Sequence, residues 1–180
     1  EYKAAVPAYM MIPAIKLFGL NEVGVRFTTS LLGTILIFLI YCLTRSVFKQ
    51  EWAALAAAWV ISIEPWAVHF SRTNHEAMTA LFLLILGLIF FLRSRHIKQL
   101  LPLSLILFLL SMYTYNSNKI IVPLFVTGLY IIHRKVINYK PLLLAILTIF
   151  LIPFLILTIN GEAFARSQST NIFKLWGSGH

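Results

Sequence analysis

The sequence contains no aspartate and only one cysteine, and these scarcities exclude whole classes of site. Its 180 residues hold six acidic side chains, all of them glutamate, against 15 lysines and arginines. Because Cys42, which lies inside an apolar run, is the single cysteine, a disulfide within the chain is excluded. Because protein metal sites are built from clusters of Cys, His, Asp and Glu, we expect no metal site and no cofactor.

The signature motifs of several soluble enzyme classes are missing as well. The chain has no Gly-rich phosphate loop, no nucleophile elbow and no dinucleotide-binding fingerprint. Its net charge is +9, but the basic residues are spread over several loops and form no stripe. We therefore expect neither nucleotide-dependent chemistry at a soluble site nor nucleic-acid binding.

Apolar side chains dominate what is present. The chain is 59% hydrophobic and only 12% charged, with a mean hydropathy of +0.85. A soluble domain of this size cannot bury so much apolar surface, so the composition indicates an integral membrane protein. The apolar runs do not alternate with polar residues, which favours helices over strands. The predicted fold class is all-α, a polytopic transmembrane helical bundle.

Six apolar segments are predicted to be the membrane helices. Since a helix rises about 1.5 Å per residue, about 20 residues cross the hydrocarbon core. The first and last segments are long enough, whereas the middle ones must recruit flanking residues or lie in a thin bilayer. The segments are Val23–Val47, Ala53–His69, Ala77–Leu92, Leu100–Tyr115, Ile120–Ile132 and Pro141–Ile159.

Basic residues in alternate loops set the expected orientation. Eight of the fifteen lie in three loops that fall on one side: Arg45, Lys49, Arg93, Arg95, Lys98, Arg134, Lys135 and Lys140. The positive-inside rule makes that side cytoplasmic. The opposite side then carries residues 1–22, the polar segment 64–76, the turn 115–119 and the tail after residue 160, so the groups capable of chemistry gather outside.

The first 22 residues are only moderately apolar and are expected to form an interfacial or re-entrant segment leading into the first membrane helix. Pro7 and Pro13 should break or kink a helix there. Gly19 and Asn21 are expected to make the following turn. Arg26 would then lie near the outer end of the first membrane helix.

The most informative feature is the polar segment EPWAVHFSRTNHE at residues 64–76, between two apolar runs. Charges beside a bilayer core are costly unless a cavity holds them, so they indicate a functional site. Arg72 could clamp a substrate phosphate through two hydrogen bonds, or it could bind a lipid headgroup phosphate. His69 and His75 are six residues apart, which does not match a helical zinc pair.

Local signals in this segment predict where the helices end. Glu64 precedes Pro65, and a residue before proline disfavours helix, so the second apolar segment should end there. Ser71, Thr73 or Asn74 could cap the next helix. Glu76 would lie in the first turn of that helix, where a carboxylate interacts favourably with the helix dipole. This structural role is the alternative to a role in substrate binding.

A second cluster, SMYTYNSNK at residues 111–119, is predicted on the same side of the membrane. Tyr113, Tyr115, Asn118 and Lys119 could form a wall of stacking surfaces and hydrogen-bonding groups for a sugar or a phosphate. An aromatic belt with a helix cap is the alternative interpretation.

These motifs, in this order, resemble the polytopic GT-C glycosyltransferases of glycosyltransferase family 39, which include protein O-mannosyltransferases and the lipid A aminoarabinose transferase. Four stretches of the chain carry the resemblance. The positions are Lys3, Tyr9, Leu17-Phe18-Gly19 and Arg26 in the first, Pro65, His69, Ser71, Arg72 and Glu76 in the second, MYTYNSNKIIVPL in the third, and FARSQSTNIF in the fourth. The chain departs from the family where Ala4 and Ala5 stand in place of the prolines that often follow the lysine.

The resemblance implies inverting transfer of a sugar from a polyprenyl-phosphate donor to a hydroxyl acceptor on a protein, lipid or glycan, at the outer face of the membrane. The substrate-binding residues it supports, together with the polar clusters, are Lys3, His69, Arg72, Glu76, Tyr113, Tyr115, Asn118 and Lys119. The family's catalytic base lies in a first outer loop. No residue here is assigned that role.

The expected organisation is a partial GT-C transmembrane domain without the first helix and first outer loop, and therefore inactive alone. It comprises the interfacial segment 1–22, membrane helices over 23–159 and an outer loop over 160–180. The expected location is the plasma or inner membrane of a prokaryote, with membrane lipid around the helices. Two alternatives are a transporter or flippase for an anionic or lipid-linked substrate, and a non-catalytic membrane subunit.

Overall fold

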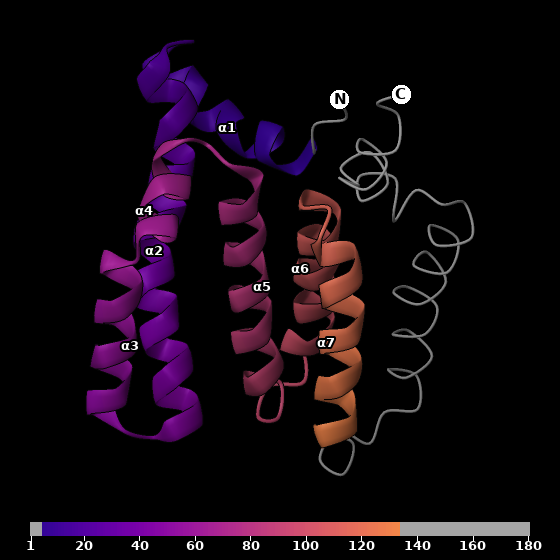
Figure 1. Cartoon of the computed structure of the whole chain (residues 1–180). Helices are drawn as coiled ribbons and strands as arrows, with labels where there is room; N and C mark the ends of the chain where they lie inside the picture. Colours follow the sequence, from indigo (N-terminus) through magenta and orange to yellow (C-terminus); the bar gives the residue numbers. More distant parts are fainter. Residues whose placement is uncertain (1–4, 134–180) are drawn as a thin grey trace, which may run out of the picture. The chain divides into compact units, whose positions relative to one another are not determined.

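The computed structural model describes residues 5–133, and every regular element in that range is an α-helix. This confirms the predicted all-helical fold class. The helices are α1 (Ala5–Phe18), α2 (Glu22–Phe48), α3 (Glu51–Ile63), α4 (Pro65–Arg72), α5 (Glu76–Arg93), α6 (Leu100–Thr114) and α7 (Asn118–His133) (Figure 1).

The chain divides into two compact units after Asn118. The first unit contains α1 to α6. In the second unit the described part is α7, an apolar helix with Pro123 inside it. The sixth predicted segment, Pro141–Ile159, and the predicted outer loop 160–180 lie outside the described residues.

Two described helices, α2 and α5, are long and apolar enough to cross a membrane. The pair α3 and α4 passes the same test as one span bent by 56°. Three further apolar helices, α1, α6 and α7, are shorter, and the 15 residues of α6 reach only about 22 Å. The short middle helices that the sequence predicts are therefore present, and the second predicted segment is a bent pair.

Within the first unit, α2, the α3–α4 pair, α5 and α6 run alternately up and down (Figure 1). The α2–α3 turn, with Lys49, and the α5–α6 loop, with Arg95 and Lys98, therefore lie at one end. We call this the basic end. The α4–α5 turn and the end of α6 lie at the other, as the loop pattern predicts. The third basic loop, residues 134–140, is outside the described residues.

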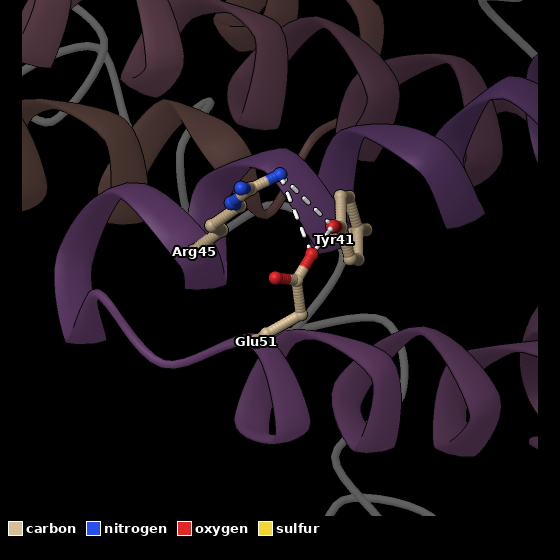
Figure 2. A network of polar contacts seen from close by, with 3 residues as sticks. All are labelled: Tyr41, Arg45 and Glu51. Atoms are coloured by element: carbon tan, nitrogen blue, oxygen red, sulfur yellow. Dashed lines mark hydrogen bonds and ion pairs between the residues drawn. The ribbon is translucent and has the colours of Figure 1, made fainter.

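At the basic end, three side chains join α2 to α3 (Figure 2). The Tyr41 hydroxyl donates to Glu51 Oε1 over 2.8 Å, and Arg45 Nη1 donates to the Tyr41 oxygen over 3.1 Å. Arg45 also lies 3.5 Å from Glu51 Oε1. Lys49 ends α2 in the left-handed conformation with a φ of 56°, which reverses the chain between the two helices.

The two prolines of α1 were predicted to break or kink a helix, and they do not break it, because α1 is one continuous helix. Pro7 lies in the first turn, where a backbone N–H has no helical partner to lose, and Pro13 is accommodated inside the helix. The predicted turn is confirmed: Gly19 adopts a φ of 80°, and Asn21 caps α2 by accepting the Gly24 N–H over 2.8 Å. Arg26 lies in the second turn of α2 and pairs with Glu22.

Small residues let the helices approach closely. A Cβ added to Gly87 of α5 would lie 3.1 Å from two ring carbons of Phe108, a fully buried residue of α6. Ser104 and Ser111 of α6 donate to the carbonyls of Gly87 and Ala80, both over 2.7 Å. Between α2 and α5, the packed residues are Leu36, Leu39, Met78, Ile85 and Ile89.

Candidate functional site

The bend between α3 and α4 is centred on Glu64, which belongs to the end of one helix and the start of the next. Its backbone is extended, with a φ of −66° and a ψ of 120°, and Pro65 occupies the first position of α4. The Glu64 carboxylate accepts the Ala67 N–H over 2.6 Å. The predicted end of the helix at Glu64–Pro65 is thus confirmed, and the same side chain starts α4 at once in a new direction.

A tight turn follows α4 and reverses the chain into α5. Asn74 has a φ of 54°, a left-handed conformation that asparagine tolerates better than most residues. The His75 ring caps α5 by accepting the Ala77 N–H at Nδ1 over 3.2 Å. The prediction that Ser71, Thr73 or Asn74 caps this helix is therefore wrong.

The other candidate caps are engaged elsewhere. The Ser71 and Thr73 hydroxyls donate to the Val68 and His69 carbonyls, which belong to α4. Glu76 is the first residue of α5, as predicted.

Helix α4 is held against α2 by contacts between small residues. The Ser30 hydroxyl donates to the Ser71 carbonyl over 3.1 Å. A Cβ added to Gly33 would lie only 2.7 Å from the Cβ of Ser71. Because α4 carries the polar segment, this close approach fixes where its side chains lie.

A cavity of about 260 Å³ opens beside the bend, between the α3–α4 pair, α5 and the end of α6. Its wall is mainly apolar and aromatic, and Glu64, Tyr115 and Asn118 contribute its polar groups. The lining residues are Ile61, Glu64, Trp66, Ala67, Phe70, Ala77, Met78, Leu81, Leu84, Tyr115 and Asn118.

Aromatic rings connect the polar segment to the end of α6. The ring of Phe70 stacks on His75, with centroids 4.5 Å apart, and lies 5.6 Å from Trp66. His75 meets Tyr115 edge to face at 6.3 Å. The two predicted polar clusters, 64–76 and 111–119, are thus brought together by the fold.

The predicted site residues divide into two sets. Tyr115 and Asn118 line the cavity, and Asn118 is buried, donating to the Ser111 hydroxyl over 2.9 Å. The other predicted site residues that the structure describes in the first unit do not line the cavity. His69 and Arg72 are exposed on α4, Tyr113 is 54% exposed, and Glu76 is partly buried. Lys119 begins the second unit, and Lys3 lies outside the described residues.

Arg72, in the polar segment, forms no ion pair with any described residue. The ion pairs among residues 5–133 join Glu22 to Arg26 and Arg45 to Glu51, and neither involves Arg72. Over the same residues, no group of three potential ligands could hold a metal ion. The chemical resources of this end are an exposed guanidinium, a partly buried carboxylate at Glu64 and an aromatic cavity.

Sequence reasoning placed Glu64 in the polar segment but did not assign it to binding, and it missed Trp66, Phe70 and Met78 as cavity residues. Trp66 and Phe70 are four apart, so a helix beginning at Pro65 puts both on one face. This four-residue spacing would have predicted a shared face for the two rings, had α4 been predicted as a separate helix. The contribution of Met78 depends on how α5 packs, and no local pattern reports it.

Residues 2–159 match the family model described as dolichyl-phosphate-mannose-protein mannosyltransferase. No curated protein and no solved structure matches the chain significantly.

Proposed function

The chain belongs to the dolichyl-phosphate-mannose-protein mannosyltransferase family, and from that membership we propose that it contributes the donor-binding part of an inverting glycosyltransferase. The family makes the protein a membrane glycosyltransferase of the mannosyltransferase type. The proposed donor is a sugar linked to a polyprenyl phosphate, and the proposed acceptor is a hydroxyl group of a protein. The proposed site faces the non-cytoplasmic side.

The observation that carries the proposal is that an apolar cavity and the exposed guanidinium of Arg72 lie at the same end of the first unit. A polyprenyl-phosphate sugar has an apolar chain, an anionic phosphate and a hydroxyl-rich ring. The cavity at Phe70, Leu81 and Leu84 suits part of the apolar chain, since burial of apolar surface is its main source of affinity. Arg72 can bind the phosphate through two parallel hydrogen bonds.

In the proposed reaction, the acceptor oxygen attacks the anomeric carbon from the side opposite the phosphate. A bond forms between that oxygen and the carbon, the bond from the carbon to the phosphate oxygen breaks, and the configuration inverts. The leaving polyprenyl phosphate takes the electron pair, so a cation near it stabilises the charge that develops. A base must accept the hydroxyl proton, and no described residue is assigned to that step.

The proposal is tested by replacing Arg72 in the full membrane enzyme and measuring sugar transfer. Arg72→Ala should lower the rate at least 100-fold, because a charge that stabilises the leaving group contributes several kcal/mol. Arg72→Lys should retain part of the rate, since it keeps the charge but loses the two-pronged geometry. Arg95→Ala, at the basic end, is the matched control and should be neutral.

If Arg72→Ala transfers sugar at the wild-type rate, the phosphate does not bind there and this part of the proposal is wrong.

A second test fills the cavity with a larger side chain. Ala77→Phe should raise the KM for a long-chain donor but not for a short-chain analogue. Ala56→Phe, at an exposed position of α3, should raise neither. Equal effects of Ala77→Phe on both donors would exclude the cavity as the chain-binding site.

The proposed orientation is tested separately, in intact cells. In a Cys42→Ser background, Arg72→Cys should react with a membrane-impermeant maleimide from outside, whereas Arg95→Cys should react only after lysis. The reverse pattern would place the polar segment on the cytoplasmic side.

A further inference from the structure

Helix α1 covers the end of the first unit that carries the polar segment. Figure 1 shows it running across the ends of the other helices rather than along them. It contacts α2 and α6. Only Pro7 and Ala14 of its 14 residues are buried, so it rests on the bundle through a narrow face.

The C-terminal end of α1 is firmly attached to α2. Asn21 joins the two helices, because its Nδ2 donates to the Phe18 carbonyl over 2.7 Å while its Oδ1 caps α2. The rings of Phe18 and Phe27 lie 4.9 Å apart. Gly19, with a φ of 80°, makes the reversal between the helices. Any displacement of α1 therefore pivots about residues 19–21.

The middle of α1 is attached by two weak contacts. The Thr28 hydroxyl donates to the Met10 carbonyl over 3.4 Å, at the long limit of a hydrogen bond. The Asn74 amide nitrogen donates to the Met11 sulfur over 3.0 Å. A thioether is a poor acceptor, so this second contact also contributes little.

Asn74 has an unused acceptor beneath α1. Its side-chain oxygen Oδ1 is buried and has no hydrogen-bond partner among the described residues. A buried polar atom without a partner is unfavourable, and such atoms in native structures call for an explanation. A ligand that donates a hydrogen bond, or displacement of α1, would relieve this cost.

We propose that α1 is a strap that closes over the α4–α5 turn through the Met11–Asn74 contact, and that its release frees the Asn74 oxygen to accept a hydroxyl of the sugar substrate. The ligand follows from the chemistry: an amide oxygen only accepts, and a sugar ring presents several O–H donors. The position follows from the chain, because Asn74 lies two residues after Arg72. The identity of the ligand rests on the proposed function.

The first experiment locks the strap in the full membrane enzyme without altering Asn74. In a Cys42→Ser background, Met10→Cys and Thr28→Cys are joined by a short bis-methanethiosulfonate reagent, which a reductant releases. Transfer should fall more than tenfold on cross-linking and recover on reduction. The control pair, Tyr41→Cys with Glu51→Cys at the basic end, should transfer equally in both states. An undiminished rate in the cross-linked Met10/Thr28 pair would overturn the proposal.

The second experiment measures the displacement without requiring activity. Spin labels at Tyr9→Cys on α1 and Ile97→Cys in the α5–α6 loop report the distance from the strap to the basic end. Adding a polyprenyl-phosphate sugar should produce a second distance population. A single distance, unchanged by the donor, would contradict the strap even if the cysteine pairs proved inactive.

Asn74 itself is tested by Asn74→Gly, which keeps the left-handed turn and removes the amide. The KM for the sugar donor should rise about tenfold with little change in kcat, whereas Thr73→Gly should change neither. An unchanged KM would exclude Asn74 as a binding group. If the wild-type enzyme transfers no sugar at all, the proposed function fails, and the spin-label distances still decide whether α1 moves.

Discussion

Gly33→Ala tests whether the position of α4 against α2 sets the geometry of the site. The added Cβ would lie 2.7 Å from the Ser71 Cβ, whereas carbon atoms in contact prefer about 3.5–4.0 Å. Both atoms are attached directly to helix backbones, so neither can rotate away. Helix α4 must therefore move from α2 by about 1 Å.

The expected loss of activity exceeds the expected loss of stability. Alanine in place of a helical glycine gains up to about 1 kcal/mol, and overpacking costs about 1–3 kcal/mol, so the net destabilisation should be about 0–2 kcal/mol. A displacement of about 1 Å at a catalytic site can lower the rate about 100-fold. Arg72, which follows Ser71 directly on α4, moves with it.

The assay compares the initial rate of sugar transfer and the thermal unfolding temperature of the purified full-length enzyme. Gly128→Ala is the matched control, since a Cβ at that glycine of α7 meets no atom within 4 Å. It should preserve the rate and slightly raise the unfolding temperature. Adding Ser71→Gly to Gly33→Ala removes the clashing atom and should restore part of the rate. A wild-type rate in Gly33→Ala alone would refute the reasoning.

Two further predictions concern stability and are checked by thermal or denaturant unfolding of the same enzyme, and a third concerns its rate of sugar transfer. Phe108→Ala removes a fully buried ring that packs on Gly87, and should lower the free energy of unfolding by about 3–5 kcal/mol. A smaller destabilisation than that of Gly33→Ala would contradict the close packing of α5 and α6. Asn21→Ala removes the cap of α2 and should cost about 1 kcal/mol, with an unchanged unfolding temperature as the contrary result. Glu51→Ala removes two exposed contacts at the basic end (Figure 2) and should leave the transfer rate unchanged, because exposed ion pairs contribute little; a lower rate would mean that this end communicates with the site.

The helices were largely predictable from the sequence, because membrane helices are specified locally by length and apolarity. The predicted segment Val23–Val47 became α2 at Glu22–Phe48, and Ala77–Leu92 became α5 at Glu76–Arg93. Helix α3 also ended where expected, before Pro65, which is the first residue of α4. The direction of α4 was not predictable. It depends on the Glu64 carboxylate, which caps the new helix, so that the chain continues as a helix and not as a loop.

The site itself was predictable as a location and not as a set of contacts. The loop pattern placed residues 64–76 and 111–119 at one end, and the fold brings His75 and Tyr115 together there. The cavity depends on how α4, α5 and α6 pack. The close approach of Gly33 to Ser71 joins residues 38 positions apart, so no periodicity in either segment could reveal it.

Membrane helices do not associate by burying apolar surface from water, so small residues and interhelical hydrogen bonds decide how they pack. The buried Ser111 hydroxyl shows what this means for the site. It donates to the Ala80 carbonyl of α5 and accepts from the Asn118 amide in the cavity wall. One hydroxyl thus fixes both the packing of α6 on α5 and the orientation of a cavity residue. The geometry of the site therefore depends on Ser111 as directly as on the groups expected to touch the substrate.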